Sequence, residues 1–254
     1  MALIQGVTEF LPVSSSGHMF LYQYFTGQTS DFRLGIWFHL ASVVALLLYF
    51  HKSIGGYLMA FLMDLFRPKS WKDNEAYLLL VWALVSCGGI LAFVSFIPLP
   101  EILTLQTVAL TLCVTAILIF LSAFWPQKKE LLESLTWPLA LLVGVIQVFA
   151  VLPGMSRSGL VLAVLILFGV ERSKAFSLAM ISGIPIIIGA SLYGVKELSL
   201  GSVVTPQFLG AFVVCVLGSL AGIIFLRSLV RNHWSWFGVY CLMLGSFLFF
   251  MVGI

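Results

Sequence analysis

Charge is what this chain lacks most. Of its 254 residues only 9% are Asp, Glu, Lys or Arg, whereas 61% are hydrophobic. A soluble domain has about 25% charged residues, so the composition excludes an ordinary soluble protein. Several apolar runs approach the ~20 residues that a helix needs to cross a bilayer. The sequence therefore predicts an all-α polytopic membrane protein with a single integral membrane domain over residues 1–254.

Cysteine is also scarce, and the net charge is small. The four cysteines lie in apolar segments without CxxC spacing, which indicates buried apolar side chains, not disulfides or metal ligands: Cys87, Cys113, Cys215 and Cys241. A net charge of +3 is too small to indicate a nucleic-acid partner.

The apolar segments are of two kinds. Six of them are long enough to be crossings: 34–50, 76–98, 102–125, 175–195, 207–228 and 235–254. In two other regions, 2–25 and 135–170, stretches of roughly 10–16 apolar residues flank a polar motif. Such stretches are too short to span as helix, so each region is predicted to be a re-entrant helix hairpin. The stretch 53–66 could be an interfacial helix and is left undecided.

Basic residues predict the orientation. If the six crossings alternate, ten of the 13 Lys and Arg residues fall on one side: Lys52, Arg67, Lys69, Lys72, Lys128, Lys129, Arg172, Lys174, Arg227 and Arg231. The positive-inside rule makes that side cytoplasmic. The first hairpin then enters from outside and the second from the cytoplasm. This is the pattern of an inverted-topology repeat, with halves of about 1–125 and 126–254 and a site near the midplane.

The two polar motifs resemble each other. Leu11–His18 reads LPVSSSGH and Leu152–Gly159 reads LPGMSRSG, with Gly17 and Gly159 142 residues apart. Before the first motif, Gln5 and Glu9 are four residues apart and therefore share one helix face, and Pro12 should end that helix. Polar groups inside a membrane indicate function.

These residues suit phosphoryl transfer. A Gly- and Ser-rich helix N-terminus attracts anions, and Arg157 offers a bidentate fork to phosphate. Glu9 and Gln5 supply hard oxygen ligands for Mg²⁺ or Ca²⁺, while Ser15 and His18 supply a nucleophile and a proton carrier. Taken singly, each has a structural alternative, such as helix packing for Glu9, capping for a serine, or neutralisation of Glu9 by Arg157. His39 lies within a crossing and is read as packing or as support for the site.

Residues Gln5–His18 resemble the signature (E/Q)GxTEFLPxSSxGH, and Pro153–Gly159 resembles PGxSRSG. Both belong to the undecaprenyl-diphosphate phosphatases, also called bacitracin-resistance proteins. The resemblance implies removal of the terminal phosphate from undecaprenyl diphosphate, a divalent cation, and a site at the outer face of the bacterial inner membrane. It also implies the fold of six spanning helices and two re-entrant pairs.

The resemblance also implies roles for individual residues. Glu9 and Gln5 would be the acidic-motif and metal residues, Ser15 or His18 the nucleophile, and Arg157 the diphosphate clamp. The expected substrate-binding groups are Gln5, Ser14, Ser16, Gly154, Ser156 and Ser158. The chain departs from the pattern at Gln5, where many relatives have Glu, and at Val161, where a hydroxyl is common. The product would be the monophosphate carrier lipid used in cell-wall synthesis, and a homodimer is left open.

A lipid-phosphate flippase or anion transporter built on the same inverted repeat is the alternative function, because broken helices at the midplane are typical of transporters. The nucleophile-rich Ser14–His18 tip favours the enzyme, since a passive anion site would not need it.

Overall fold

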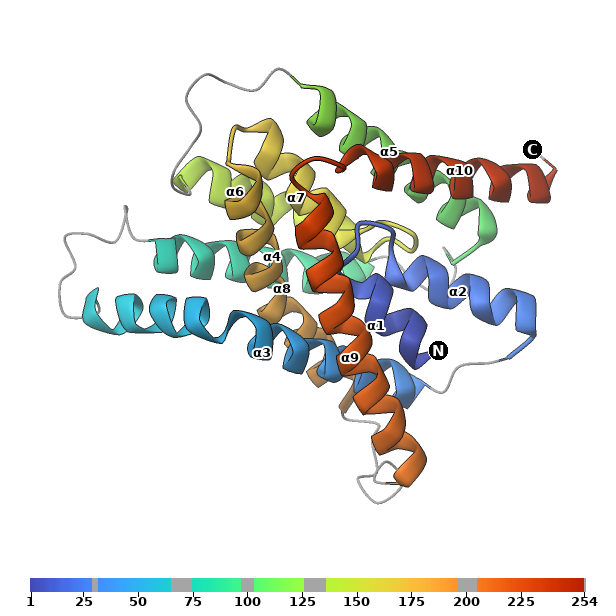
Figure 1. The fold of residues 1–254 in the computed structure, drawn as a ribbon, viewed down its shortest axis with the longest axis horizontal. Coiled ribbons are helices and arrows are strands. Elements are labelled where there is room, and N and C mark those ends of the chain that lie inside the picture. Colours follow the sequence, from blue (N-terminus) through green and yellow to red (C-terminus); the bar gives the residue numbers. More distant parts are fainter. Residues whose placement is uncertain (29–31, 65–74, 97–102, 126–135, 196–204, 254) are drawn as a thin grey trace.

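The computed structural model describes residues 1–28, 32–64, 75–96, 103–125, 136–195 and 205–253. In these ranges every regular element is a helix (Figure 1). The elements are α1 (Ala2–Phe10), α2 (Ser15–Thr26), α3 (Phe32–Asp64), α4 (Glu75–Phe96), α5 (Leu105–Phe124), α6 (Trp137–Ile146), the 3₁₀ helix η3 (Gln147–Val151), α7 (Arg157–Leu167), α8 (Arg172–Val195), α9 (Pro206–Leu229) and α10 (Ser235–Val252).

Four helices within the described ranges are long and apolar enough to cross a membrane: Trp37–Met63, Leu105–Phe124, Pro206–Leu229 and Ser235–Val252. This confirms an all-α protein with several potential membrane spans. The predicted crossings at 76–98 and 175–195 correspond to α4 and α8, which are not among these four. The end of the predicted crossing at 76–98 and the start of the one at 102–125 lie outside the described residues.

One boundary in the sequence analysis was wrong. The predicted crossing 34–50 and most of the undecided stretch 53–66 form the single 33-residue helix α3. Lys52, which lies beyond the end of the predicted crossing, is therefore part of the same helix. The helix continues because no proline interrupts it, and Gly55 and Gly56, with nothing within 4 Å of an added Cβ, weaken a helix without ending it.

Both polar motifs fall between two short helices. Helix α1 ends at Phe10, as Pro12 predicts, and α2 begins after Ser14, whose hydroxyl accepts a hydrogen bond of 3.1 Å from the backbone N–H of Gly17. In the second motif Ser156 caps α7 in the same way, accepting 3.1 Å from the N–H of Gly159. Within the described chain Ser14 is the one non-glycine residue with positive φ, at 68°. Such strain is concentrated at functional sites.

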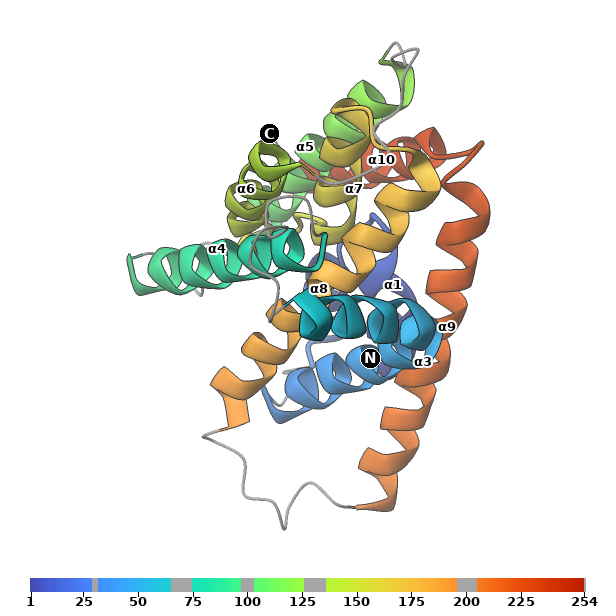
Figure 2. The same cartoon turned by 90° about the vertical axis from the view of Figure 1, so that its left-hand side faces the viewer.

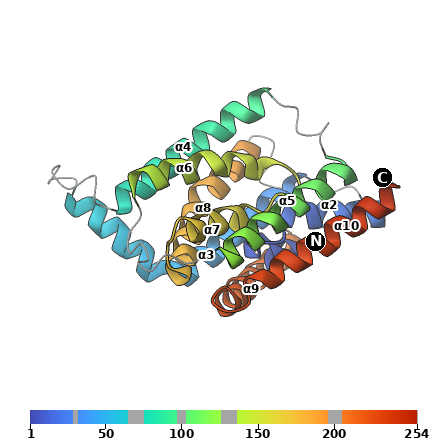
Figure 3. The same cartoon turned by 90° about the horizontal axis from the view of Figure 1, so that it is seen from above.

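Long-range helix packing brings the two motifs together. Helix α1 lies along α9 and α6 along α4, while α5 and α10 run side by side (Figures 1 and 3). Helix α3 packs against both α8 and α9 (Figure 2). A Cβ on Gly222 of α9 would lie 2.6 Å from the carbonyl oxygen of Val7, so this glycine permits the close approach of α1. α1, which carries Gln5 and Glu9, is thereby fixed to a long helix from the other half of the chain.

Candidate active site

Glu9 is the centre of the site. Its side chain is only 6% exposed. One carboxylate oxygen, Oε2, accepts hydrogen bonds of 2.7 Å from Gln5 Nε2 and 2.6 Å from Ser15 Oγ. The other, Oε1, lies 3.7 Å from Arg157 Nη2 and 3.9 Å from His39 Nδ1. The predicted shared face of Gln5 and Glu9 is confirmed, and His39 lies beside the site.

Arg157 faces Glu9 with unused donors. Its side chain is 12% exposed, and Nη1 and Nη2 are buried without a hydrogen-bond partner among the described residues. The guanidinium lies on Gly183 of α8, where an added Cβ would collide with Nη1. A buried guanidinium without hydrogen-bond acceptors is costly, and a phosphate would supply them in the bidentate geometry that arginine favours.

The two motifs touch each other. A Cβ on Gly17 would lie 3.2 Å from the Cα of Gly154. The hydroxyls of Ser156 and Ser158 both donate to the carbonyl oxygen of Leu11, over 3.4 and 3.2 Å. Two segments about 140 residues apart in sequence therefore form one site, as the sequence analysis expects.

Helix α5 supports the second motif. The hydroxyl of Thr111 donates 2.6 Å to the carbonyl oxygen of Pro153, and that of Thr115 accepts 3.3 Å from the backbone N–H of Ser156. Gly154 itself has φ of 84°, a conformation that other residues rarely adopt. The sequence analysis did not predict a role for either threonine. In sequence each is only a hydroxyl on an apolar helix, and such a hydroxyl commonly bonds to the backbone of its own helix.

His18 has a partner that the sequence analysis missed. Its Nδ1 lies 2.8 Å from the carbonyl oxygen of Ser14, and its Nε2 lies 2.6 Å from Tyr240 Oη of α10. Because a carbonyl can only accept, Nδ1 carries a proton, and in the neutral ring Nε2 then accepts from the tyrosine hydroxyl. No hydrogen bond joins His18 to Ser15 in the part of the chain that the structure describes. The signal for Tyr240 in sequence is a tyrosine in the middle of an apolar crossing.

The remaining serines form a hydroxyl pair within each motif. Ser14 Oγ lies 3.2 Å from Ser16 Oγ, and Ser156 Oγ lies 3.2 Å from Ser158 Oγ. Of these four only Ser16 is exposed. In this structure the serine hydroxyls cap helices and join the two motifs, so their role as donors to phosphate stays a prediction. The predicted substrate contact of Gly154 stays a prediction as well.

The oxygen ligands available at the site determine whether it could hold the divalent cation that the family resemblance implies. Glu9 is the one carboxylate of the site, and the described ranges hold no cluster of three His, Cys, Asp or Glu that could bind a metal. Gln5 adds an amide oxygen, a hard but neutral ligand. Mg²⁺ is usually bound by one or two carboxylates together with substrate phosphates. These residues therefore fit a cation that binds together with a diphosphate.

Comparisons with known proteins identify the family of this chain. Over 260 residues the chain is 30% identical to a Halalkalibacterium halodurans protein named undecaprenyl-diphosphatase 2, covering 98% of this chain and 93% of that one. It is 31% identical over 260 residues to an undecaprenyl-diphosphatase of Borrelia hermsii, covering 99% and 96%. A relative of the same name from Thermosipho africanus is 30% identical over 255 residues. The family model described as bacitracin resistance protein BacA matches residues 1–247, and the chain belongs to this family.

Proposed function

We propose that this protein is an undecaprenyl-diphosphate phosphatase that releases inorganic phosphate and returns undecaprenyl phosphate to cell-wall synthesis. The family and the names of its relatives support the reaction and its link to bacitracin resistance. The observation that carries the proposal is the pair of buried Arg157 nitrogens, which have no hydrogen-bond partner among the described residues and face the Ser15–Glu9 hydrogen bond. A flippase or anion transporter is not favoured, because an anion carrier needs no hydroxyl held on a carboxylate.

The geometry supports Ser15 as nucleophile. Its hydroxyl already donates to Glu9 at 2.6 Å, so Glu9 can accept the proton as Oγ attacks the terminal phosphorus. The bond from that phosphorus to the bridging oxygen breaks, undecaprenyl phosphate leaves, and a phosphoserine remains. The proton on Glu9 passes to the departing undecaprenyl phosphate, so Glu9 is a carboxylate again. Glu9 then takes a proton from the water that attacks the phosphoserine, Ser15 recovers its hydroxyl proton, and inorganic phosphate is released. Arg157 holds the diphosphate oxygens in the first step and the transferred phosphoryl group in the second, so positioning and charge neutralisation provide most of the catalysis.

His18 fits the nucleophilic role less well. Both of its ring nitrogens are engaged, with the Ser14 carbonyl and with Tyr240, so attack would first require one of these contacts to break. A divalent cation bound through Glu9 and the Gln5 amide oxygen would neutralise charge on the diphosphate.

The topology that we propose is the inverted repeat of six crossings and two re-entrant pairs, with halves near 1–125 and 126–254. Matching features 142 residues apart support it: the caps made by Ser14 and Ser156, and the hydroxyl pairs Ser14–Ser16 and Ser156–Ser158. In this repeat α6 is the counterpart of α1 and α4 is the counterpart of α9. The packing of α1 on α9 is therefore matched by the packing of α6 on α4. The family resemblance implies a site at the outer face of the inner membrane, and the charge pattern predicts that the first hairpin enters from outside.

Phosphate release from undecaprenyl diphosphate by the purified protein tests the function. Glu9→Gln and Arg157→Ala should each lower kcat/KM by at least 100-fold, the scale for losing one preorganised charged group. Arg172→Ala is the matched control, because Arg172 binds the carbonyl oxygen of Arg231 in another part of the molecule. Parallel reactions with chelator test the cation. Absence of release by the wild type, or undiminished release by both site variants, would reject the proposal.

The nucleophile is tested separately. Ser15→Ala should abolish both turnover and the trapped phosphoprotein, whereas His18→Ala should still form phosphoserine. Near-full turnover by Ser15→Ala would rule out the serine route.

A further inference from the structure

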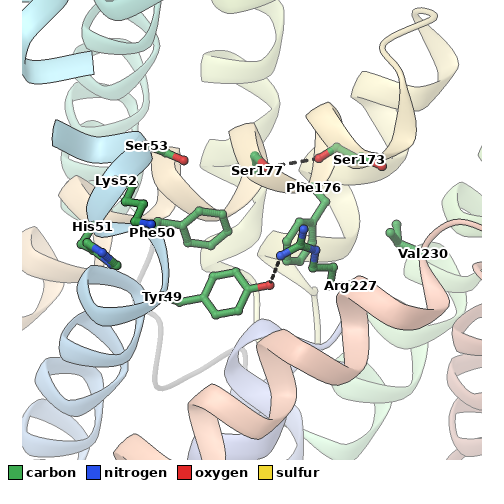
Figure 4. A pocket seen from close by; sticks show the side chains of 10 residues that line it. All are labelled: Tyr49, Phe50, His51, Lys52, Ser53, Ser173, Phe176, Ser177, Arg227 and Val230. Carbon is green, nitrogen blue, oxygen red and sulfur yellow. Dashed lines mark hydrogen bonds between the residues drawn. The ribbon is translucent and has the colours of Figure 1, made fainter. Parts of the chain in front are cut away.

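A polar cavity opens where α3, α8 and α9 meet, with a volume of about 290 Å³ (Figure 4). Tyr49 of α3 lies on its wall. His39, which borders the catalytic site, is ten residues earlier on the same helix, so the two sites are separated by about 15 Å along the helix axis at 1.5 Å per residue. The cavity is therefore distinct from the catalytic site.

The cavity is positively charged. Lys52 and Arg227 line it together with His51, and no carboxylate is among its lining residues. Within the described ranges, neither Lys52 nor Arg227 forms an ion pair with a carboxylate. Two basic side chains without a counter-ion at one cavity favour binding of an anion.

Arg227 is held in a fixed orientation. Its Nη1 donates 2.7 Å to the hydroxyl of Tyr49, and its guanidinium carbon lies 5.9 Å from the centre of that ring (Figure 4). One of the five guanidinium N–H donors is thereby used, which leaves the others to bind a ligand. Preorganisation of this kind lowers the entropy lost on binding.

Hydroxyls and apolar side chains complete the cavity. Ser173 and Ser177 lie one turn apart near the N-terminus of α8, and Ser173 Oγ accepts 2.9 Å from Arg231 Nε. The buried side chains of Phe50, Phe176 and Val230 form the apolar part of the lining. A basic and hydroxylic lining beside an apolar surface suits an amphiphile with an anionic head. Basic pockets between membrane helices bind such lipid headgroups.

We infer that this cavity binds a phosphate-bearing anion, and that the ligand is the headgroup of an anionic phospholipid. The lipid is favoured as the source because two of the three lining helices, α3 and α9, have the length and hydropathy of membrane spans. The bound lipid would join α3 and α8 to α9, the helix against which α1 packs. Lipid binding should therefore stabilise the whole protein.

The test uses purified full-length protein in a neutral detergent after lipid removal. Dioctanoyl phosphatidylglycerol is titrated while thermal unfolding is followed by tryptophan fluorescence. A ligand that binds only the folded protein raises Tm with its concentration, which yields an apparent Kd. Parallel titrations use dioctanoyl phosphatidylcholine, and inorganic phosphate at matched ionic strength. Arg157→Ala should respond like the wild type, because that substitution affects only the catalytic site.

Cavity variants locate the effect. Arg227→Gln and Lys52→Gln should each weaken the apparent Kd for phosphatidylglycerol about ten-fold, and Ser177→Leu, which fills the cavity, should abolish binding. Arg172→Gln removes the same charge outside the cavity lining and should leave Kd unchanged. Saturable stabilisation by inorganic phosphate alone, lost in Arg227→Gln, would keep the anion site and assign it to free phosphate. Wild-type affinity in both Arg227→Gln and Ser177→Leu, or equal weakening in Arg172→Gln, would overturn the inference.

Discussion

Gly183 offers the most specific test of how the site is built. It lies on α8, outside both polar motifs, and the guanidinium of Arg157 rests directly on it. An added Cβ would collide with Nη1 and would lie 2.6 Å from Cζ and 3.0 Å from Nη2. Carbon and nitrogen atoms need about 3.5–4.0 Å. In Gly183→Ala the guanidinium must therefore move by roughly 1 Å or more.

We expect a large loss of activity with little loss of stability. A displacement of ~1 Å in a positioning group can cost about 100-fold in rate. The fold should tolerate the methyl group, because alanine in a helix is favoured over glycine by about 1 kcal/mol, which offsets part of the clash. In a phosphate-release assay kcat/KM should fall about 100-fold while Tm changes by only a few degrees.

The same helix provides the control. Gly189, six residues further along α8, has nothing within 4 Å of an added Cβ. Gly189→Ala should have wild-type activity and equal or higher Tm. If Gly183→Ala retained wild-type kcat/KM, the geometry assigned to Arg157 would be refuted.

Three further predictions concern positions that support the site or stabilise the fold. Tyr240→Phe removes the hydroxyl bonded to His18 Nε2 at 2.6 Å; because neither residue is the proposed nucleophile, phosphoserine formation should persist, and its loss would contradict the serine route. Gly154→Ala should lower the free energy of unfolding by at least about 2 kcal/mol, because φ of 84° already costs an L-residue about 1–2 kcal/mol and the Cβ would lie 2.8 Å from Val108 Cα. Denaturant or thermal unfolding measures the change in this free energy. Burial of Glu171 acts to raise the pKa of its carboxyl, but hydrogen bonds from Ser173 and Lys174 and the charge of Arg231 outweigh burial and hold that pKa below 4.5. The stabilisation from this carboxylate is thus present above about pH 4.5 and lost as pH falls further, so the Tm difference between the wild type and Glu171→Ala should shrink below that pH; a constant difference would contradict it.

Local rules predicted the parts of the site that are close in sequence. The end of α1 before Pro12 follows from proline chemistry, and the Gln5–Glu9 contact follows from helical periodicity. The similarity of the two polar motifs, Leu11–His18 and Leu152–Gly159, indicated that they would lie together at one site. Nothing local indicated that the crossing ending at Phe50 and the possible helix at 53–66 would be one continuous helix, since a charged residue such as Lys52 marks either a loop or an exposed helix position.

Residues that contact the site from distant helices could not be found in this way. Gly183 matters only because Arg157 lies across it, and Tyr240 only because α10 brings it to His18. Thr111 bonds to its own helix as well as to Pro153, so its hydroxyl reads in sequence as an ordinary helix feature. Such contacts depend on tertiary packing, which a single sequence does not specify.

The proposed repeat explains why the protein has one reactive centre and not two. With an offset of 142 residues, Ser15 corresponds to Arg157, so the same position after a capping serine would supply the proposed nucleophile in one half and the proposed phosphate clamp in the other. Glu9 corresponds to Val151, and Gln5 corresponds to Gln147, whose Oε1 accepts 2.6 Å from the indole of Trp82. The second half thus has a capped tip without a carboxylate, and its glutamine accepts a hydrogen bond from an indole. Converging tips bring complementary charges together, whereas two identical acidic tips would repel each other and the diphosphate.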